Sequence, residues 1–79
     1  MTNNEILIKV VDVFAPMADT EDEITEESEL IEDLGISSMD VLFLVSSLEA
    51  EFKVKVPQKL VRKMVTIGDV VEILESLIQ

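Results

Sequence analysis

Three segments of this 79-residue chain repeat apolar residues at intervals of three and four, the spacing of one face of an α-helix. Each segment follows a Ser or Thr with an acidic residue three positions later, a pattern typical of a helix N-terminus. Alternation of the kind found in strands is faint and confined to residues 53–56. The sequence therefore predicts an all-α fold, and the length predicts a single domain over residues 1–79 with a thin core.

Four helices are expected, three longer and one short. Pro16 should end the first, because proline disfavours helical angles in the preceding residue, and Pro57 suits the first position of the short third helix. The expected boundaries are Asn3 to Ala15, Ser38 to Phe52, Pro57 to Met64 and Ile67 to Leu77. The predicted architecture is a small four-helix bundle with a long loop between helices one and two.

Caps and apolar stripes identify the residues expected at the helix starts and in the core. The capping pairs are Thr2 with Glu5, Ser37 with Asp40, and Thr66 with Asp69. The apolar staple pairs that flank two of these caps are Ile36 with Val41 and Val65 with Val70. The expected core stripes are Leu7, Val10, Val11 and Phe14, broadened by Ile6, Val13 and Met17; then Val41, Leu44, Val45, Leu48 and Phe52; and finally Ile67, Val70, Val71, Leu74, Leu77 and Ile78.

Residues 16–37 are rich in Asp and Glu and lack helical periodicity, so they form the predicted loop. A calcium-binding EF-hand is excluded, because a loop counted from Asp19 would need a glycine sixth and a glutamate twelfth. Those places hold Ile24 and Leu30, and no metal site is predicted. The apolar residues expected to hold the loop against the helices are Ile24, Leu30, Ile31 and Leu34.

Charge is distributed unevenly along the chain. The chain has 17 acidic and 6 basic residues, a net charge of -11, so the folded state experiences self-repulsion. This charge opposes binding to nucleic acid or to an anionic membrane, and predicts protein partners with basic docking patches. Five of the six basic residues lie from Lys53 to Lys63, where their simplest role is to offset nearby acids. A separate basic binding site has no support in the sequence alone.

The sequence shows no export signal and no membrane span. Its N-terminus lacks the basic region and apolar core of a signal peptide, and its longest apolar run, residues 41–45, is too short to cross a bilayer. We expect a soluble, cytoplasmic monomer without membrane insertion.

The segment Glu32-Asp33-Leu34-Gly35-Ile36-Ser37-Ser38-Met39-Asp40 is the most informative part of the chain. Gly35 lets the loop adopt backbone angles that other residues avoid, and Ser37 is a good N-cap. Ser38 is then expected on the exposed first turn, where free N–H groups and the helix macrodipole favour an anionic substituent such as a phosphodiester. Serines before a helix are capping residues far more often than modification sites, so the local pattern alone favours Ser37 and Ser38 as only a cap and its neighbour.

Catalysis by the chain itself is not expected. The sequence has no His and no Cys, and its acids lie mostly in the loop, so the usual bases and covalent nucleophiles are missing apart from unactivated hydroxyls and lysines. Ser38 has no visible base and is better interpreted as a group that another enzyme modifies.

A second apolar stripe lies on the predicted second helix, beside the core stripe. A small bundle has little room to bury so wide an apolar arc, which favours exposure of this stripe to a partner. It begins next to Ser38 and consists of Met39, Leu42, Phe43 and Ser46.

The segment from Asp33 to Asp40, followed by an apolar helix ending in Phe52, resembles an acyl carrier protein over nearly the whole chain. In that family, an Asp-Leu-Gly segment leads to an Asp-Ser-Leu triplet whose serine carries 4'-phosphopantetheine. The matching residues here are Ser37, Ser38 and Met39, so two positions depart from the pattern. Ser37 can still cap a helix and Met39 is still bulky and apolar, and the attachment serine is retained.

The resemblance implies a mechanism and partners. A phosphopantetheinyl transferase would move the group from coenzyme A to Ser38, and its thiol would carry acyl intermediates as thioesters. The partners would be acyl-loading, synthase or acyltransferase enzymes of fatty-acid, polyketide or related lipid biosynthesis. Phe43 stands where resembling proteins usually have a glutamate, which indicates a specialised carrier. The implied docking residues are Met39, Asp40, Leu42, Phe43, Ser46 and Glu49.

Two other functions remain open. An unmodified acidic helical adaptor could bind a basic partner through the second stripe. A free-standing peptidyl or aminoacyl carrier would use the same Ser38, although the length and acidity of the chain mildly oppose it.

Overall fold

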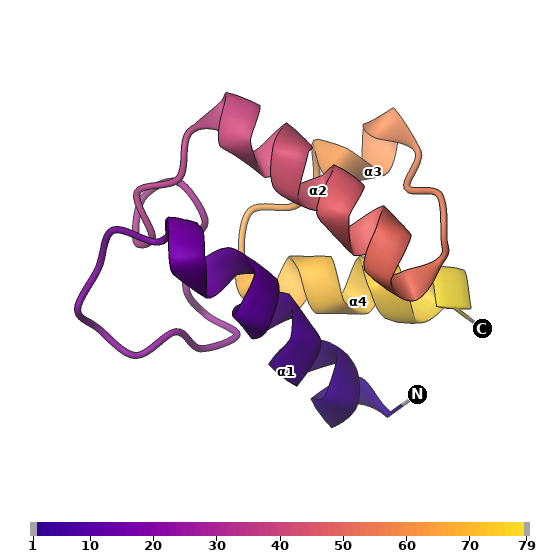
Figure 1. Cartoon of the computed structure of the whole chain (residues 1–79), viewed down its shortest axis with the longest axis horizontal. Coiled ribbons are helices and arrows are strands. Elements are labelled where there is room, and N and C mark those ends of the chain that lie inside the picture. Colours follow the sequence, from indigo (N-terminus) through magenta and orange to yellow (C-terminus); the bar gives the residue numbers. More distant parts are fainter. Residues whose placement is uncertain (1, 79) are drawn as a thin grey trace.

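The computed structural model describes residues 2–78, and its regular elements are helices joined by one long loop (Figure 1). The predicted four-helix, all-α architecture is confirmed. Within the described residues the nearest approach to a strand is an isolated antiparallel bridge between Glu29 and Thr66. The helices are α1 (Asn3–Phe14), α2 (Ser38–Phe52), α3 (Gln58–Val61) and α4 (Ile67–Ile78), with a 3-10 turn (Ala15–Met17) after α1.

The capping box at the start of α1 forms as predicted. The Thr2 hydroxyl accepts the Glu5 N–H at 3.2 Å, and the Thr2 N–H donates to the Glu5 carboxylate at 3.0 Å. The backbone N–H of Thr2, and then its hydroxyl, hold the pKa of the Glu5 carboxyl below its ordinary value. The ionised form is therefore favoured in the folded state, and this stabilisation is lost as the pH falls through the lowered pKa.

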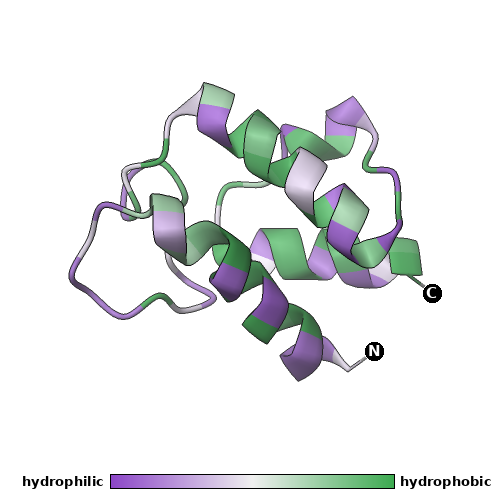
Figure 2. Ribbon diagram, viewed as in Figure 1, coloured by the Kyte–Doolittle hydropathy of each residue, from purple (hydrophilic) through white to green (hydrophobic). Residues whose placement is uncertain are grey.

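A single apolar cluster forms the core, with α1 packed mainly on α4 and less on α2. Figure 2 shows the apolar faces of these helices turned toward one another. The predicted stripes supply most of the cluster, and the long loop and the turns after α3 supply the rest. The buried apolar residues are Ile6, Val10, Phe14, Leu30, Leu34, Ile36, Val41, Leu44, Val45, Leu48, Met64, Ile67, Val70, Val71 and Leu74.

Three residues predicted to pack are exposed instead: Met17, Ile31 and Val65. Met17 lies in the 3-10 turn around Pro16, whose tighter winding breaks the angular register of α1. Val65 uses its carbonyl to accept the Leu30 N–H at 2.9 Å, and its side chain points to solvent, so the expected staple with Val70 does not form. The other staple pair, Ile36 and Val41, is buried as predicted.

The long loop is tied to the start of α4 by backbone hydrogen bonds. Besides the bond from Leu30, the Ile67 N–H donates to the Ser28 carbonyl at 3.0 Å and the Gly68 N–H to the Glu26 carbonyl at 2.9 Å. A Cβ at position 68 would lie 3.1 Å from that Glu26 oxygen, so glycine permits this close approach. The predicted capping box of Thr66 and Asp69 also forms, with N–H to oxygen distances of 3.1 and 3.0 Å.

Helix α3 is a single turn, shorter than the predicted segment from Pro57 to Met64. Pro57 precedes the helix rather than opening it. After Val61 the chain continues in tighter turns, in which the Met64 N–H bonds to the Val61 carbonyl at 3.1 Å. These turns bring the Met64 side chain into the core. The sequence, which predicted an uninterrupted helix up to Met64, did not indicate them.

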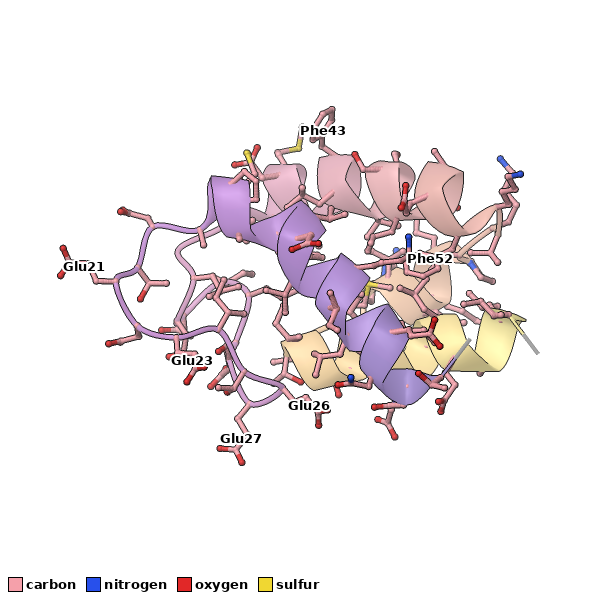
Figure 3. The ribbon with its side chains drawn as sticks, turned by 60° about the horizontal axis from the view of Figure 1, so that its bottom comes forward. Glu21, Glu23, Glu26, Glu27, Phe43 and Phe52 are labelled. Carbon is pink, nitrogen blue, oxygen red and sulfur yellow. The ribbon has the colours of Figure 1, made fainter. Side chains whose placement is uncertain are left out.

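Most acidic side chains remain in solvent without a cation. Glu21, Glu23, Glu26 and Glu27 extend outward from the loop (Figure 3). Within residues 2–78 there is one ion pair, between Lys9 Nζ and Glu51 Oε1 at 3.0 Å, and both side chains are largely solvent-accessible. Repulsion among the acids is therefore relieved mainly by dissolved ions.

We predict that added sodium chloride or millimolar magnesium raises the Tm, because screening reduces self-repulsion and leaves apolar burial intact. Each kcal/mol of relieved repulsion should raise the Tm by about 4–8 °C for a domain of this size. Calorimetry at increasing ionic strength measures the effect. A Tm that stays constant or falls would contradict it.

Candidate functional site

The loop before α2 is fixed by its own hydrogen bonds. The Asp33 carboxylate accepts the Glu29 N–H at 2.8 Å, and the Asp19 N–H donates to the Leu34 carbonyl at 2.7 Å. Leu34 is buried, and Gly35 has a φ of 68°, in the left-handed region that favours glycine. The prediction for Gly35 is therefore confirmed, and this segment sets the position at which α2 begins.

The two serines at the start of α2 differ in their contacts. Ser37 is the N-cap, and its hydroxyl accepts the Asp40 N–H at 3.2 Å. The return bond, in which the Ser37 N–H would donate to the Asp40 carboxylate, is not formed, so only half of this predicted capping box is present. Ser38 is the exposed first residue of α2, and within residues 2–78 its hydroxyl makes no hydrogen bond.

Ser38 lies at the edge of an apolar groove between α2 and α3. The groove has a volume of about 330 Å³. The resemblance also implied an apolar seam between helices that could shelter an acyl chain, but the sequence did not indicate which residues line it, because its walls come from three separate segments with no local signal. Its lining residues are Ile31, Ser38, Val41, Leu42, Gln58, Val61, Arg62 and Met64.

The second stripe of α2 is exposed, as predicted. The exposed fractions are 76% for Met39, 47% for Leu42 and 64% for Phe43. Phe43 points away from the rest of the protein, whereas Phe52 lies toward the helices below α2 (Figure 3). Ser46 is also exposed, and its hydroxyl donates to the Leu42 carbonyl at 3.4 Å. These four residues, the apolar patch of α2, therefore form a continuous surface beside Ser38.

The two acidic residues predicted to take part in docking are both half-buried. Asp40 is in the first turn of α2, where its charge suits the helix macrodipole. The Glu49 carboxylate accepts the Val56 N–H at 2.8 Å, across the turn in which Lys53 adopts a left-handed φ of 57°. Glu49 thus holds the connection from α2 to α3, a role that the sequence did not indicate.

We predict that Glu49→Ala lowers the free energy of unfolding by ~1–2 kcal/mol, since a charge-assisted hydrogen bond to a partly buried N–H is lost. Glu51→Ala is the matched control on the same helix, and its exposed ion pair should be worth under ~1 kcal/mol. Urea denaturation measures both variants. Equal losses would mean that the Glu49 bond does not stabilise this turn.

Comparison with known proteins assigns the chain to a family. A family model described as a phosphopantetheine attachment site matches residues 8–74. The acyl carrier protein of Thermotoga maritima is 39% identical over 76 residues, which cover 95% of this chain and 94% of that protein. The chain belongs to the acyl carrier protein family. Acyl carrier proteins are carriers rather than enzymes, and their cofactor is 4'-phosphopantetheine.

Two further comparisons agree. The acyl carrier protein of Wolinella succinogenes is 44% identical over 55 residues, or 70% of this chain and 72% of that protein. The solved structure of the acyl carrier protein from Enterococcus faecalis superposes with a TM-score of 0.82 at 31% identity, covering 98% of this chain and 99% of that one. Acyl carrier proteins interact with synthases and transferases, and this general role holds for the present carrier.

The residues around Ser38 fit a phosphopantetheine group. Its hydroxyl is exposed and makes no hydrogen bond to any residue from 2 to 78, so a substituent there would break no hydrogen bond among them. The groove beside it offers apolar walls from α2 and from the turns after α3. Among residues 2–78, no cluster of acidic residues could hold a metal ion, and no helix is long and apolar enough to cross a membrane.

Proposed function

We propose that Ser38 carries 4'-phosphopantetheine and that this single-domain carrier transfers acyl groups between enzymes of fatty-acid, polyketide or related lipid biosynthesis. The observation that supports this assignment is the contrast between the two serines: Ser37 is engaged as a cap, whereas Ser38 has a free, exposed hydroxyl at the edge of the groove. We propose the cytoplasm as its compartment, because coenzyme A is the donor of the group.

Each part of the site has a role in this function. Gly35 and the Ser37 cap define the first turn of α2, whose N–H groups and macrodipole favour the phosphodiester on Ser38. When bound, the group supplies a thiol on a flexible arm, which holds the acyl chain as a thioester. Val41, Leu42 and Val61 line the groove and would shelter an apolar chain from water.

The first test is modification of the purified chain by a broad-specificity phosphopantetheinyl transferase, followed by intact-mass measurement. The native chain should gain the mass of one phosphopantetheine, and Ser38→Ala should gain none. Ser37→Ala should still be modified, although loss of the cap should cost ~1 kcal/mol of stability.

Two results would contradict the assignment. Modification on Ser37 would contradict the assignment of Ser38 as the attachment site. No gain with several transferases would favour the unmodified adaptor, which the exposed apolar patch of α2 also suits. Loading of the modified chain with an amino acid in place of an acyl group would identify a peptidyl carrier.

We also propose that the apolar patch of α2 is the centre of the docking surface, with Asp40 and Glu49 at its margins. A partner with basic side chains would meet Asp40 and the acidic loop that precedes α2. Phe43 is the largest exposed apolar side chain on this surface, and it gives the carrier an anchor for a dedicated set of partners. This arrangement supports a specialised carrier.

Phe43→Glu should leave the fold intact and weaken binding to the carrier's own synthase or acyltransferase, because an apolar anchor becomes a charge. Leu48→Ala is the core control on the same helix: Leu48 is fully buried, and its truncation should cost ~2–5 kcal/mol. Thermal melts and titration calorimetry measure the two effects. A Phe43→Glu variant with unchanged affinity would remove Phe43 from the docking surface.

A further inference from the structure

The basic residues of this acidic carrier are concentrated in one region. Residues 38–63 contain five basic and three acidic residues, a net charge of +2, whereas the rest of the chain carries -13. Within residues 2–78 none of these five cations forms an ion pair, since the single pair uses Lys9. The interpretation that they offset nearby acids therefore has no direct contact to support it. We call them the basic flank: Lys53, Lys55, Lys59, Arg62 and Lys63.

The basic flank borders the docking surface on two sides. Arg62 lines the same groove as Ser38 and Leu42. Lys53 and Lys55 line a second hollow together with Ser46, the last residue of the apolar patch of α2. All five cations are exposed, so their charges face solvent and are available to a partner.

Glu49 lines the same hollow as Lys53 and Lys55, but among residues 2–78 no acidic residue of α2 forms an ion pair with the basic flank. The Glu49 carboxylate is bonded to the Val56 N–H, and Glu51 is paired with Lys9 on α1. Asp40 lies at the opposite end of α2, next to the acidic loop that enters the helix. In Figure 1 this loop enters α2 at its N-terminal end and α3 lies beside α2 farther along, while Ile31 of the loop and Arg62 line the same groove. The groove beside Ser38 is therefore bordered by the acidic loop at Ile31 and by the basic flank at Arg62, and along α2 the apolar patch lies between the loop and Lys53.

We propose that this carrier docks to a partner protein whose apolar pocket is bordered by acidic side chains where it meets α3. This inference rests on the proposed function and adds to it the charge of the partner surface that faces α3. The opposite border of the partner, facing Asp40 and the loop, is basic. Because one border of the carrier's docking surface is acidic and the other is basic, charge complementarity fixes the orientation in which the carrier approaches. It also disfavours enzymes that present a uniformly basic surface.

The experiment uses a phosphopantetheinyl transferase that binds carriers through Lys and Arg, and a variant of it with the basic residues that face α3 changed to Glu. The substrates are the native carrier, Arg62→Glu and the matched control Lys9→Glu. Both carrier variants change the net charge from -11 to -13, but Lys9 lies on α1. Intact-mass kinetics give kcat/KM, and thermal melts verify that all three chains are folded.

Arg62→Glu should raise kcat/KM with the basic enzyme by about two- to tenfold, the range expected for reversing one exposed charge, and lower it with the Glu enzyme. Lys9→Glu should change either value by less than about twofold. Both effects of Arg62→Glu should diminish at high salt.

Three results would overturn the proposal. Equal effects of Arg62→Glu and Lys9→Glu would mean that only net charge matters. A fall in kcat/KM for Arg62→Glu with the basic enzyme would reverse the predicted sign. Cosedimentation of the native carrier, but not of Arg62→Glu, with phosphatidylglycerol vesicles would assign the basic flank to a lipid surface. If no enzyme modifies the native chain, the proposed function itself fails, and this inference fails with it.

Discussion

Burial of loop residues between the helices is the constraint on which this structure depends. The three longer helices provide only part of the apolar surface that so small a chain needs for a core. Leu30, Leu34 and Ile36 complete that core from the loop, and backbone bonds from residues 26–30 hold the loop to the start of α4. Because the same loop leads directly into the Ser37 cap, packing in the core also determines where Ser38 stands.

The sequence predicted the helices well where local interactions decide them. The boxes at Thr2 and Thr66 need only residues three positions apart, and both form. Prediction was wrong where tertiary contacts override a local pattern. Ile31 has the hydropathy of a core residue, yet it stands at the rim of the groove, half-exposed. Helix α3 was predicted too long because packing of Met64 in the core, rather than the local sequence pattern, determines where the helix ends.

In the candidate site too, local features could be predicted from the sequence and tertiary features could not. Exposure of Ser38 follows from its place after a cap, so sequence alone could predict it. The lining of the groove could not be predicted, because Ile31, Val41 and Arg62 come together only in the folded chain. Glu49 was also assigned incompletely: its bond to Val56 spans seven residues and depends on the left-handed turn at Lys53, which has no glycine to signal it.

In the proposed docking mode, different parts of the outer face of α2 provide affinity for a partner and orientation toward it. Leaving Phe43 in solvent forgoes part of the ~1.5–3 kcal/mol that burial of such a side chain provides, and a partner recovers this free energy only in the complex. In the proposed docking mode, the apolar patch of α2 supplies most of the affinity and sets the lifetime of the complex. In the same proposal, the charges at the borders of the patch act earlier, during encounter, where they select the orientation and raise the rate of association. A carrier that must bind and leave several enzymes benefits from this separation, because orientation can be specific while the apolar contact stays small enough for rapid release.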